Sequence, residues 1–172
     1  GPAVIGVSEI ENRAVLEDLI SNPLLKDSGY QIVHFDSPDK RGVDVALLYR
    51  PRFFRVTSST STPLFIYKED GERIYTRNQL VVSGMFDGEP MSFIVNHWPS
   101  RSGGEAASRP RRNAAADLTR HLTDSLLAIN PQAKVVIMGD LNDDPINESL
   151  RKHLKAGANP DKLKQGELFN CM

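Results

Sequence analysis

The sequence has 172 residues, which suits one domain and is too short for two ordinary ones. Hydrophobic residues make up 40% of it and charged residues 25%, a composition that allows a buried core and excludes disordered or fibrous proteins. The 21 basic and 22 acidic side chains give a net charge of −1, which excludes a protein that coats polyanions through a general basic excess. The charges are segregated: residues 101–112 contain four arginines and one glutamate, and residues 140–144 contain three aspartates and no base.

Cysteine content and hydropathy exclude further classes. The single cysteine, Cys171, cannot form an internal disulfide or a cysteine-based zinc site. No apolar run approaches the roughly 18–20 residues that a membrane span needs, so we expect no transmembrane segment. We also expect no signal peptide in this chain, because the sequence begins directly with a segment typical of a strand.

Strands and one helix are expected in the first part of the chain. Apolar residues at helical spacing predict a helix over residues 11–21, which Asn22-Pro23 ends. Apolar or β-branched runs predict strands over residues 3–8, 30–35, 43–50 and 53–61.

A hairpin and a long helix are expected next. Two alternating runs, residues 78–86 and 91–97, flank Asp87-Gly88, a dipeptide typical of hairpin turns. Residues 98–110 lack an apolar period and are expected to form a loop. Residues 111–130 have the clearest helical pattern.

The last part of the chain returns to a strand. Residues 134–138 predict a strand that continues into Gly139-Asp140, and Asn147 is expected to cap a short helix that ends near residue 155. Together, the elements favour a mixed sheet, or two sheets with helices outside, over an alternating parallel fold.

Polar residues follow this strand in the run Gly139-Asp-Leu-Asn-Asp-Asp144. Oxygen ligands such as those of Asp140 and Asn142 suit hard cations like Mg²⁺, and ligand sites often form at the carboxyl ends of strands. The alternative is a solvated Asx turn with capping carboxylates.

Four other residues are candidates for a functional site. His97 ends a strand before a Gly/Ser/Arg loop, where it suits a general acid or phosphate ligand; the alternative is a half-buried histidine that packs beside tryptophan. Glu9 lies where a strand ends and a helix begins, and a carboxylate there also suits the helix N-terminus. Asp44 lies at a strand start, a position that is more often exposed, and Arg77 precedes a strand.

Glu9, His97, Asp140 and Asn142 all lie where strands end. If those strands are neighbours, the side chains line one edge of the sheets. Metal-assisted attack on a phosphate ester is then available: a cation polarises the phosphoryl oxygens, a carboxylate orients water, and a histidine protonates or stabilises a leaving oxygen.

These residues stand in sequence contexts that resemble a known family. Glu9 in VIGVSEIEN, Arg77 in TRNQL, His97 in VNHWPSR and the run MGDLNDDP resemble, in order, the motifs of the endonuclease/exonuclease/phosphatase superfamily, which has the deoxyribonuclease I-like fold. RGVDVALLYRP is similar to the segment between the first two motifs. The resemblance extends over residues 3–154. It implies an α/β fold, a four-layer α/β sandwich of two mixed, largely antiparallel sheets with helices outside, and a divalent metal, Mg²⁺ or Mn²⁺ with Ca²⁺ as an alternative.

The resemblance also implies roles by position. Glu9 matches the metal-ligand glutamate, and Asp140 matches the aspartate that orients or activates the attacking water. Asn142 matches the asparagine that contacts the scissile phosphate. His97 matches a phosphate ligand or acid, and Asp44 matches, more loosely, the acid that orients this histidine.

Arginines are the expected contacts to substrate phosphate. Arg77 matches such a contact in the family. An arginine fork suits phosphate in general, so Arg101, Arg109, Arg111 and Arg112 are further candidates; the alternative for these four is a solvated loop and helix start.

Two parts of the family pattern are expected to be missing from this chain. The family begins with a strand that carries a metal-binding asparagine, and it ends with a strand and a catalytic Asp-His pair. Residues 1–172 are therefore expected to form a single, incomplete domain. None of His34, His121 and His153 matches the terminal histidine.

The resemblance implies a metal-dependent phosphodiesterase, and a nuclease acting on DNA or RNA is the first interpretation. A phosphatase or lipid phosphodiesterase on the same fold, and a non-catalytic fragment or binding module, are the alternatives. The NHWPSR motif is similar to that of a bacterial branch that is often secreted or surface-associated, which implies a secreted or periplasmic location. The sequence leaves the oligomeric state open.

Overall fold

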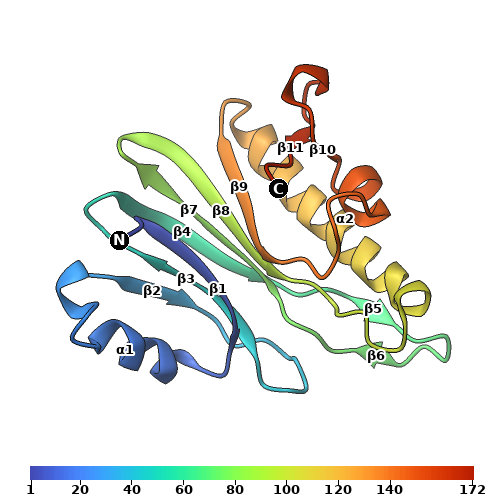
Figure 1. Ribbon diagram of the computed structural model, residues 1–172, viewed down its shortest axis with the longest axis horizontal. Helices are drawn as coiled ribbons and strands as arrows, with labels where there is room; N and C mark the ends of the chain where they lie inside the picture. Colours follow the sequence, from blue (N-terminus) through green and yellow to red (C-terminus); the bar gives the residue numbers. More distant parts are fainter. The chain divides into compact units, whose positions relative to one another are not determined.

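The computed structural model describes residues 1–172, which form two compact units (Figure 1). The first unit contains Gly1–His97 and Ala133–Asp140, and the second contains Trp98–Gln132 and Leu141–Met172. Every helix is too short or too polar to cross a membrane.

A three-stranded antiparallel sheet begins the first unit. Its strands are β1 (Val4–Ile10), β2 (Gln31–His34) and β3 (Asp44–Tyr49), in the order β1-β3-β2. Between β1 and β2 lie α1 (Arg13–Ser21) and the 3₁₀ turn η1 (Lys26–Ser28). The side chain of Asn12 accepts a hydrogen bond from the backbone N–H of Val15 and caps α1, which confirms the predicted helix.

A four-stranded mixed sheet completes the first unit. It has the order β4-β7-β8-β9, with antiparallel pairs β4/β7 and β7/β8 and a parallel pair β8/β9. The predicted hairpin is confirmed, because the turn at Asp87-Gly88 joins β7 to β8. The bounds are β4 (Phe54–Thr62), β7 (Gln79–Phe86), β8 (Glu89–His97) and β9 (Lys134–Asp140); the separate two-stranded ribbon consists of β5 (Ile66–Tyr67) and β6 (Arg73–Ile74).

Alternation along β3 places apolar side chains on both of its faces. Val45 and Leu47 belong to a buried cluster with residues of β4, β7 and β8, so this cluster is the core between the two sheets. Ala46 and Leu48 pack instead with Leu16 of α1. The first unit is therefore a two-sheet sandwich with a helix on one outer face, in agreement with the α/β class predicted from the sequence.

The long helix of the second unit begins earlier than predicted. α2 spans Glu105–Ile129 and includes Pro110, so the loop predicted for residues 98–110 is wrong over its last six positions. A proline inside a helix removes one backbone hydrogen bond, which argued against a helix there. The guanidinium of Arg112 donates to the carbonyl of Glu105 and to the hydroxyl of Ser108, and these contacts hold the first turns together.

Short elements complete the second unit. Residues Ser149–His153 form a π-helical turn, η2, where a capped α-helix was expected. Asn147 does not cap it, because its side-chain oxygen accepts from the backbone N–H of Asp144, on the preceding turn. The remaining elements are β10 (Ala156–Gly157), the 3₁₀ turn η3 (Pro160–Lys162) and β11 (Leu168–Phe169), which pairs with β10.

Candidate active site

Strand register brings several predicted residues to one edge of the first unit. β8 and β9 are parallel, and His97 is paired with Asp140, so both strands end at the same edge. β7 is antiparallel to β8 and begins there, shortly after Arg77. The Nε2 atom of His97 lies 3.7 Å from Oδ2 of Asp140 and 4.0 Å from Oε1 of Glu9, at the end of β1.

A β-bulge turns Glu9 toward this edge. Ser8 is paired with Val45 and Ile10 with Asp44, so Glu9 is an extra residue in β1. Its φ of 61° lies in the left-handed region, which is uncommon for glutamate. In a regular strand Glu9 would share a face with Val7, which packs on the α1 side of the sheet. The bulge instead leaves a carboxylate that is 63% exposed and faces His97.

The imidazole of His97 is buried between the two carboxylates and Arg77. Its side chain is 3% exposed, and Nδ1 is buried without a hydrogen-bond partner. Burial and the nearby positive charge of Arg77 lower its pKa from the ordinary 6.5, and the charges of Asp140 and Glu9 offset only part of this effect. The carboxylates that face Nε2 favour the tautomer with the proton on that nitrogen. His97 is therefore a neutral donor near pH 7.

The lowered pKa of His97 predicts an acid-sensitive fold. Well above about pH 6.5 the histidine is neutral in both the folded and the unfolded chain. As the pH falls below that value the unfolded chain binds the proton first, so the free energy of unfolding decreases until the pH passes the folded pKa. The free energy of unfolding should be measured by urea titration at about pH 7.5 and about pH 5.5 in the presence of a chelator. It should decrease less between these two pH values in His97→Gln than in the parent. An equal loss in both proteins would contradict this assignment.

Gly139 allows Asp140 to reach His97. Its φ is +121°, and a Cβ at this position would lie 2.0 Å from the backbone oxygen of Asn96 on β8. We expect Gly139→Ala to lower the free energy of unfolding by about 2 kcal/mol or more, through backbone strain and displacement of β9. Gly71→Ala is the control, because Gly71 has φ +84° and open space around it. Equal losses of stability in urea titrations would show that the close approach to Asn96 is unimportant.

Arg77 is held inside the site by hydrogen bonds. Nε donates to the backbone oxygen of His97 at 3.1 Å, Nη1 donates to Asp39 at 3.0 Å, and the residue is 6% exposed. Burial raises the pKa of Asp39, but the backbone N–H of Arg41 and the guanidinium of Arg77 lower it more, so the net pKa is below its usual value. The exposed Arg41 also lies 3.6 Å from Glu9. Sequence reasoning missed Asp39, because nothing in the turn around it distinguishes this acid.

Asp44 is not placed to orient His97. One of its carboxylate oxygens accepts from the backbone N–H and hydroxyl of Ser37, and the other lies 3.0 Å from Nε2 of His34. The alternation of side chains along β3 explains why Asp44 does not contact His97. Asp44 is two residues from Ala46 and therefore shares its face of the sheet, which is the face that packs against α1. The carboxylates that face His97 belong to Glu9 and Asp140. With Asp36, the His34–Asp44 pair forms a cluster whose potential metal-ligand atoms lie within 4.8 Å of one another.

Asn142 and Arg101 belong to the second unit. Asn142 follows Asp140 by two residues, has a φ of 54°, and donates from its side chain to the backbone oxygen of Trp98. Nε of Arg101 donates to the backbone oxygen of Asn142, and Nη2 donates to Asp144 at 2.9 Å. The hydrogen bond that Arg101 donates to Asp144 raises the pKa of the guanidinium. Arg101 thus fixes the turn that carries Asn142.

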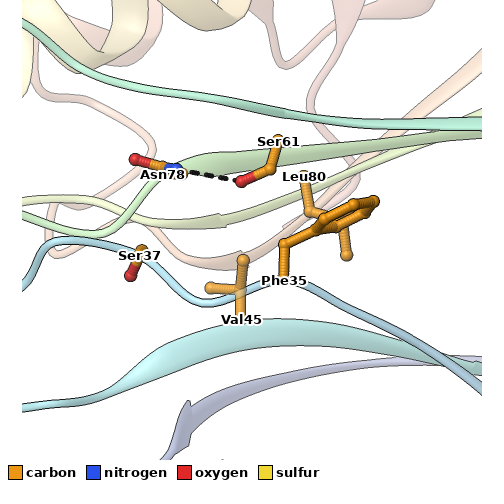
Figure 2. Close-up of a pocket in the computed structure, with 6 residues that line it drawn as sticks. All are labelled: Phe35, Ser37, Val45, Ser61, Asn78 and Leu80. Atoms are coloured by element: carbon orange, nitrogen blue, oxygen red, sulfur yellow. Dashed lines mark hydrogen bonds between the residues drawn. The ribbon is translucent and has the colours of Figure 1, made fainter.

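A small recess lies between the two sheets. The side chain of Asn78 donates to the hydroxyl of Ser61 at its polar end (Figure 2). The recess is lined by Phe35, Ser37, Val45, Ser61, Asn78 and Leu80. No predicted site residue lines it, so the strand-end edge is the better candidate for chemistry.

Comparisons with known proteins give a family and a fold. A model of the endonuclease/exonuclease/phosphatase family matches residues 1–172. Truncated Caenorhabditis elegans TDP2 has a similar structure, with a TM-score of 0.62 and 21% identity over 86% of this chain and 52% of that chain. D. rerio TDP2, solved with a single-strand DNA product, has a TM-score of 0.58 and 15% identity over 87% of this chain and 50% of that chain.

A third structure extends the range of relatives. ANGEL2, a 2′,3′-cyclic phosphatase, has a TM-score of 0.63 and 14% identity over 87% of this chain and 42% of that chain. The present chain thus spans about half the length of these structures. A search of curated proteins gave no match.

Proposed function

Because this chain belongs to the endonuclease/exonuclease/phosphatase family, we propose that it carries a divalent-metal-dependent site for hydrolysis of phosphodiester bonds, with nucleic acid as the substrate. The observation that supports this most directly is the convergence of Glu9, Asp140 and His97 at one edge of the first unit. Two accessible carboxylates beside a buried neutral imidazole provide a metal ligand, a proton acceptor and a proton donor at one place.

The donor set suits Mg²⁺ or Mn²⁺. Glu9 and Asp140 are 63% and 51% exposed, and their oxygens are hard ligands that such cations accept. Glu9 is the proposed ligand, because its bulge directs the carboxylate to the site at the cost of an unfavourable φ. When bound, the cation supplies polarisation of the phosphoryl oxygens and neutralises their charge.

The protein's own groups would act on the water and on the phosphate. Asp140 accepts a hydrogen bond from the attacking water and takes its proton. Nε2–H of His97 donates to a phosphoryl or leaving oxygen. The two carboxylates lie 3.7 and 4.0 Å from this nitrogen, beyond hydrogen-bond distance, so the proton is available to the substrate. For Asn142, which Trp98 and Arg101 hold in its turn, the phosphate contact is proposed from its place in the family motif alone.

Arg41 is a better candidate for a direct phosphate contact than Arg77. The side chain of Arg41 is 55% exposed and already lies beside Glu9, whereas Arg77 is buried and donates to Asp39 and to His97. We propose that Arg77 positions the end of β8 and that Arg41 contacts the substrate. The exposed fork of Arg41 suits a phosphate geometrically.

Two of the similar structures favour nucleic acid over lipid. D. rerio TDP2 was solved with a single-strand DNA product, and ANGEL2, a 2′,3′-cyclic phosphatase, was solved with adenosine-2′,3′-vanadate, so both structures hold nucleotide ligands. A substrate panel of single-stranded DNA, RNA, a 2′,3′-cyclic nucleotide and sphingomyelin separates the nuclease from the phosphatase and the lipid phosphodiesterase. Preferential cleavage of sphingomyelin would contradict the nuclease assignment.

Removal of divalent metal is expected to abolish hydrolysis. Excess EDTA should reduce cleavage of bis(p-nitrophenyl) phosphate to background, because the polarisation of the phosphoryl oxygens is lost. Addition of Mg²⁺ or Mn²⁺ in excess over the chelator should restore the rate, and added Na⁺ at matched ionic strength is the control. Full activity in excess chelator would contradict the proposal.

A further inference from the structure

The two-stranded ribbon in the first unit has one aromatic face. In the ribbon, labelled β5 and β6 in Figure 1, Tyr67 is paired with Arg73. The same antiparallel register continued by two residues sets Phe65 opposite Tyr75. Side chains alternate along each strand, so Phe65, Tyr67, Arg73 and Tyr75 share a face, which we call the aromatic face.

The aromatic face is open, whereas the opposite face is packed. Phe65, Tyr67 and Tyr75 are 57%, 59% and 43% exposed, whereas Ile66, between the first two, is 7% exposed. An exposed group of three aromatic rings on so short a ribbon is unusual for a surface that contacts only water.

A guanidinium stacks among these rings. Cζ of Arg73 lies 4.3 Å from the ring centroid of Phe65 and 4.8 Å from that of Tyr75. The Nε atom of Arg73 is buried and has no hydrogen-bond partner. Arg73 therefore contacts aromatic rings rather than an acid, and it presents a cation within the aromatic face.

The aromatic face adjoins the proposed hydrolytic site. The ribbon lies between the end of β4 and the start of β7, which are paired through Thr62 and Gln79 at the same edge. Tyr75 is two residues from Arg77 along the chain. At the turn, the ammonium of Lys68 donates a hydrogen bond to the carboxylate of Glu72.

We propose that the aromatic face binds single-stranded nucleic acid by stacking the bases next to the scissile phosphate; this inference rests on the proposed function. Aromatic rings and a flat guanidinium stack on bases of any sequence, and the cation suits the adjacent phosphates. A duplex keeps its bases inside the helix, so the preferred partner is a single strand.

Binding of a labelled oligonucleotide tests the proposal without any turnover. Fluorescence anisotropy of a fluorescein-labelled oligothymidylate of about 12 nucleotides should be measured with the full chain in excess chelator. We expect Phe65→Leu, Tyr75→Leu and Arg73→Gln each to weaken binding about tenfold, because leucine keeps the apolar volume but lacks the stacking surface. An abasic oligonucleotide of equal length and charge should bind weakly to the parent and be insensitive to Phe65→Leu and Tyr75→Leu.

Arg52→Gln is the matched control, because Arg52 also lies over a ring, 5.5 Å from the centroid of Phe53, but at the opposite end of β4. Parental affinity in the three ribbon variants, or equal binding of the abasic strand, would overturn the proposal. So would binding of the parent to phosphatidylcholine vesicles with no binding to the oligonucleotide. Hydrolysis of bis(p-nitrophenyl) phosphate by the unmodified protein tests the proposed function separately, so failure of either can be recognised.

Discussion

Asp140→Asn is expected to lower kcat for phosphodiester hydrolysis by about 10²-fold or more, the usual scale for loss of an acid–base group. Asparagine keeps the size of the side chain and the strand pairing with His97, but its amide cannot accept a proton from water. The rate should be measured with bis(p-nitrophenyl) phosphate at saturating Mg²⁺, so that weaker metal binding does not account for the loss. A variant rate near that of the parent would remove Asp140 from the role of proton acceptor.

Asp87→Asn is the matched control for this experiment. Asp87 is exposed in the turn between β7 and β8, at the end of β8 opposite His97, and its φ is 48°. Asparagine tolerates this left-handed conformation as well as aspartate does, so the same chemical change should leave both folding and kcat unchanged. A comparable loss in both variants would indicate a general effect of charge on the protein.

Much of the first unit could be predicted because its signals are local. The Asp87-Gly88 pair identified the β7–β8 hairpin, and the apolar spacing over residues 11–21, with Asn22-Pro23 after it, identified α1. The strand ends that carry His97 and Asp140 could also be located, since each polar residue follows an apolar run. Their pairing on adjacent parallel strands required the three-dimensional register.

Other features of the candidate site depend on contacts that sequence patterns do not encode. Glu9 faces His97 only because a bulge adds one residue to β1, and no apolar period marks this bulge. Asp39 sits in a polar turn and becomes important only through Arg77, 38 residues away. Asp44 was predicted to orient His97 but contacts His34, because the sequence alone did not define which face of β3 it occupies.

The exposure of the arginines in residues 101–112, in the second unit, could not be predicted from the sequence either. Their type and clustering suggested phosphate contacts, but Arg112 is fully buried and donates to Asp143 at 2.6 Å. Asp143, whose side chain is 1% exposed, also accepts a hydrogen bond from Ser149. An exposed arginine and a buried one have the same appearance in the sequence, so the interpretation of Arg112 as a phosphate ligand is wrong.

This buried ion pair predicts the largest stability effect in the chain. Arg112→Met should lower the free energy of unfolding by about 3–5 kcal/mol, because the carboxylate of Asp143 remains buried without its principal partner. The loss should be measured by urea titration followed by circular dichroism of the helical signal. Arg109→Met is the matched control on the same helix: Arg109 is 47% exposed and lies 3.9 Å from Glu105, so its pair should contribute about 0.5 kcal/mol or less.

A double variant separates the loss of the ion pair from the loss of packing. Asp143→Leu combined with Arg112→Met removes both charges. The double variant should therefore unfold at a higher urea concentration than Arg112→Met alone. Recovery will be incomplete, because the hydroxyl of Ser149 loses its acceptor and the carbonyl of Glu105 loses a donor. If the single variants and the double variant show additive losses instead, the buried charge of Asp143 is not what destabilises Arg112→Met, and the arginine stabilises the start of α2 through its contacts with that helix alone.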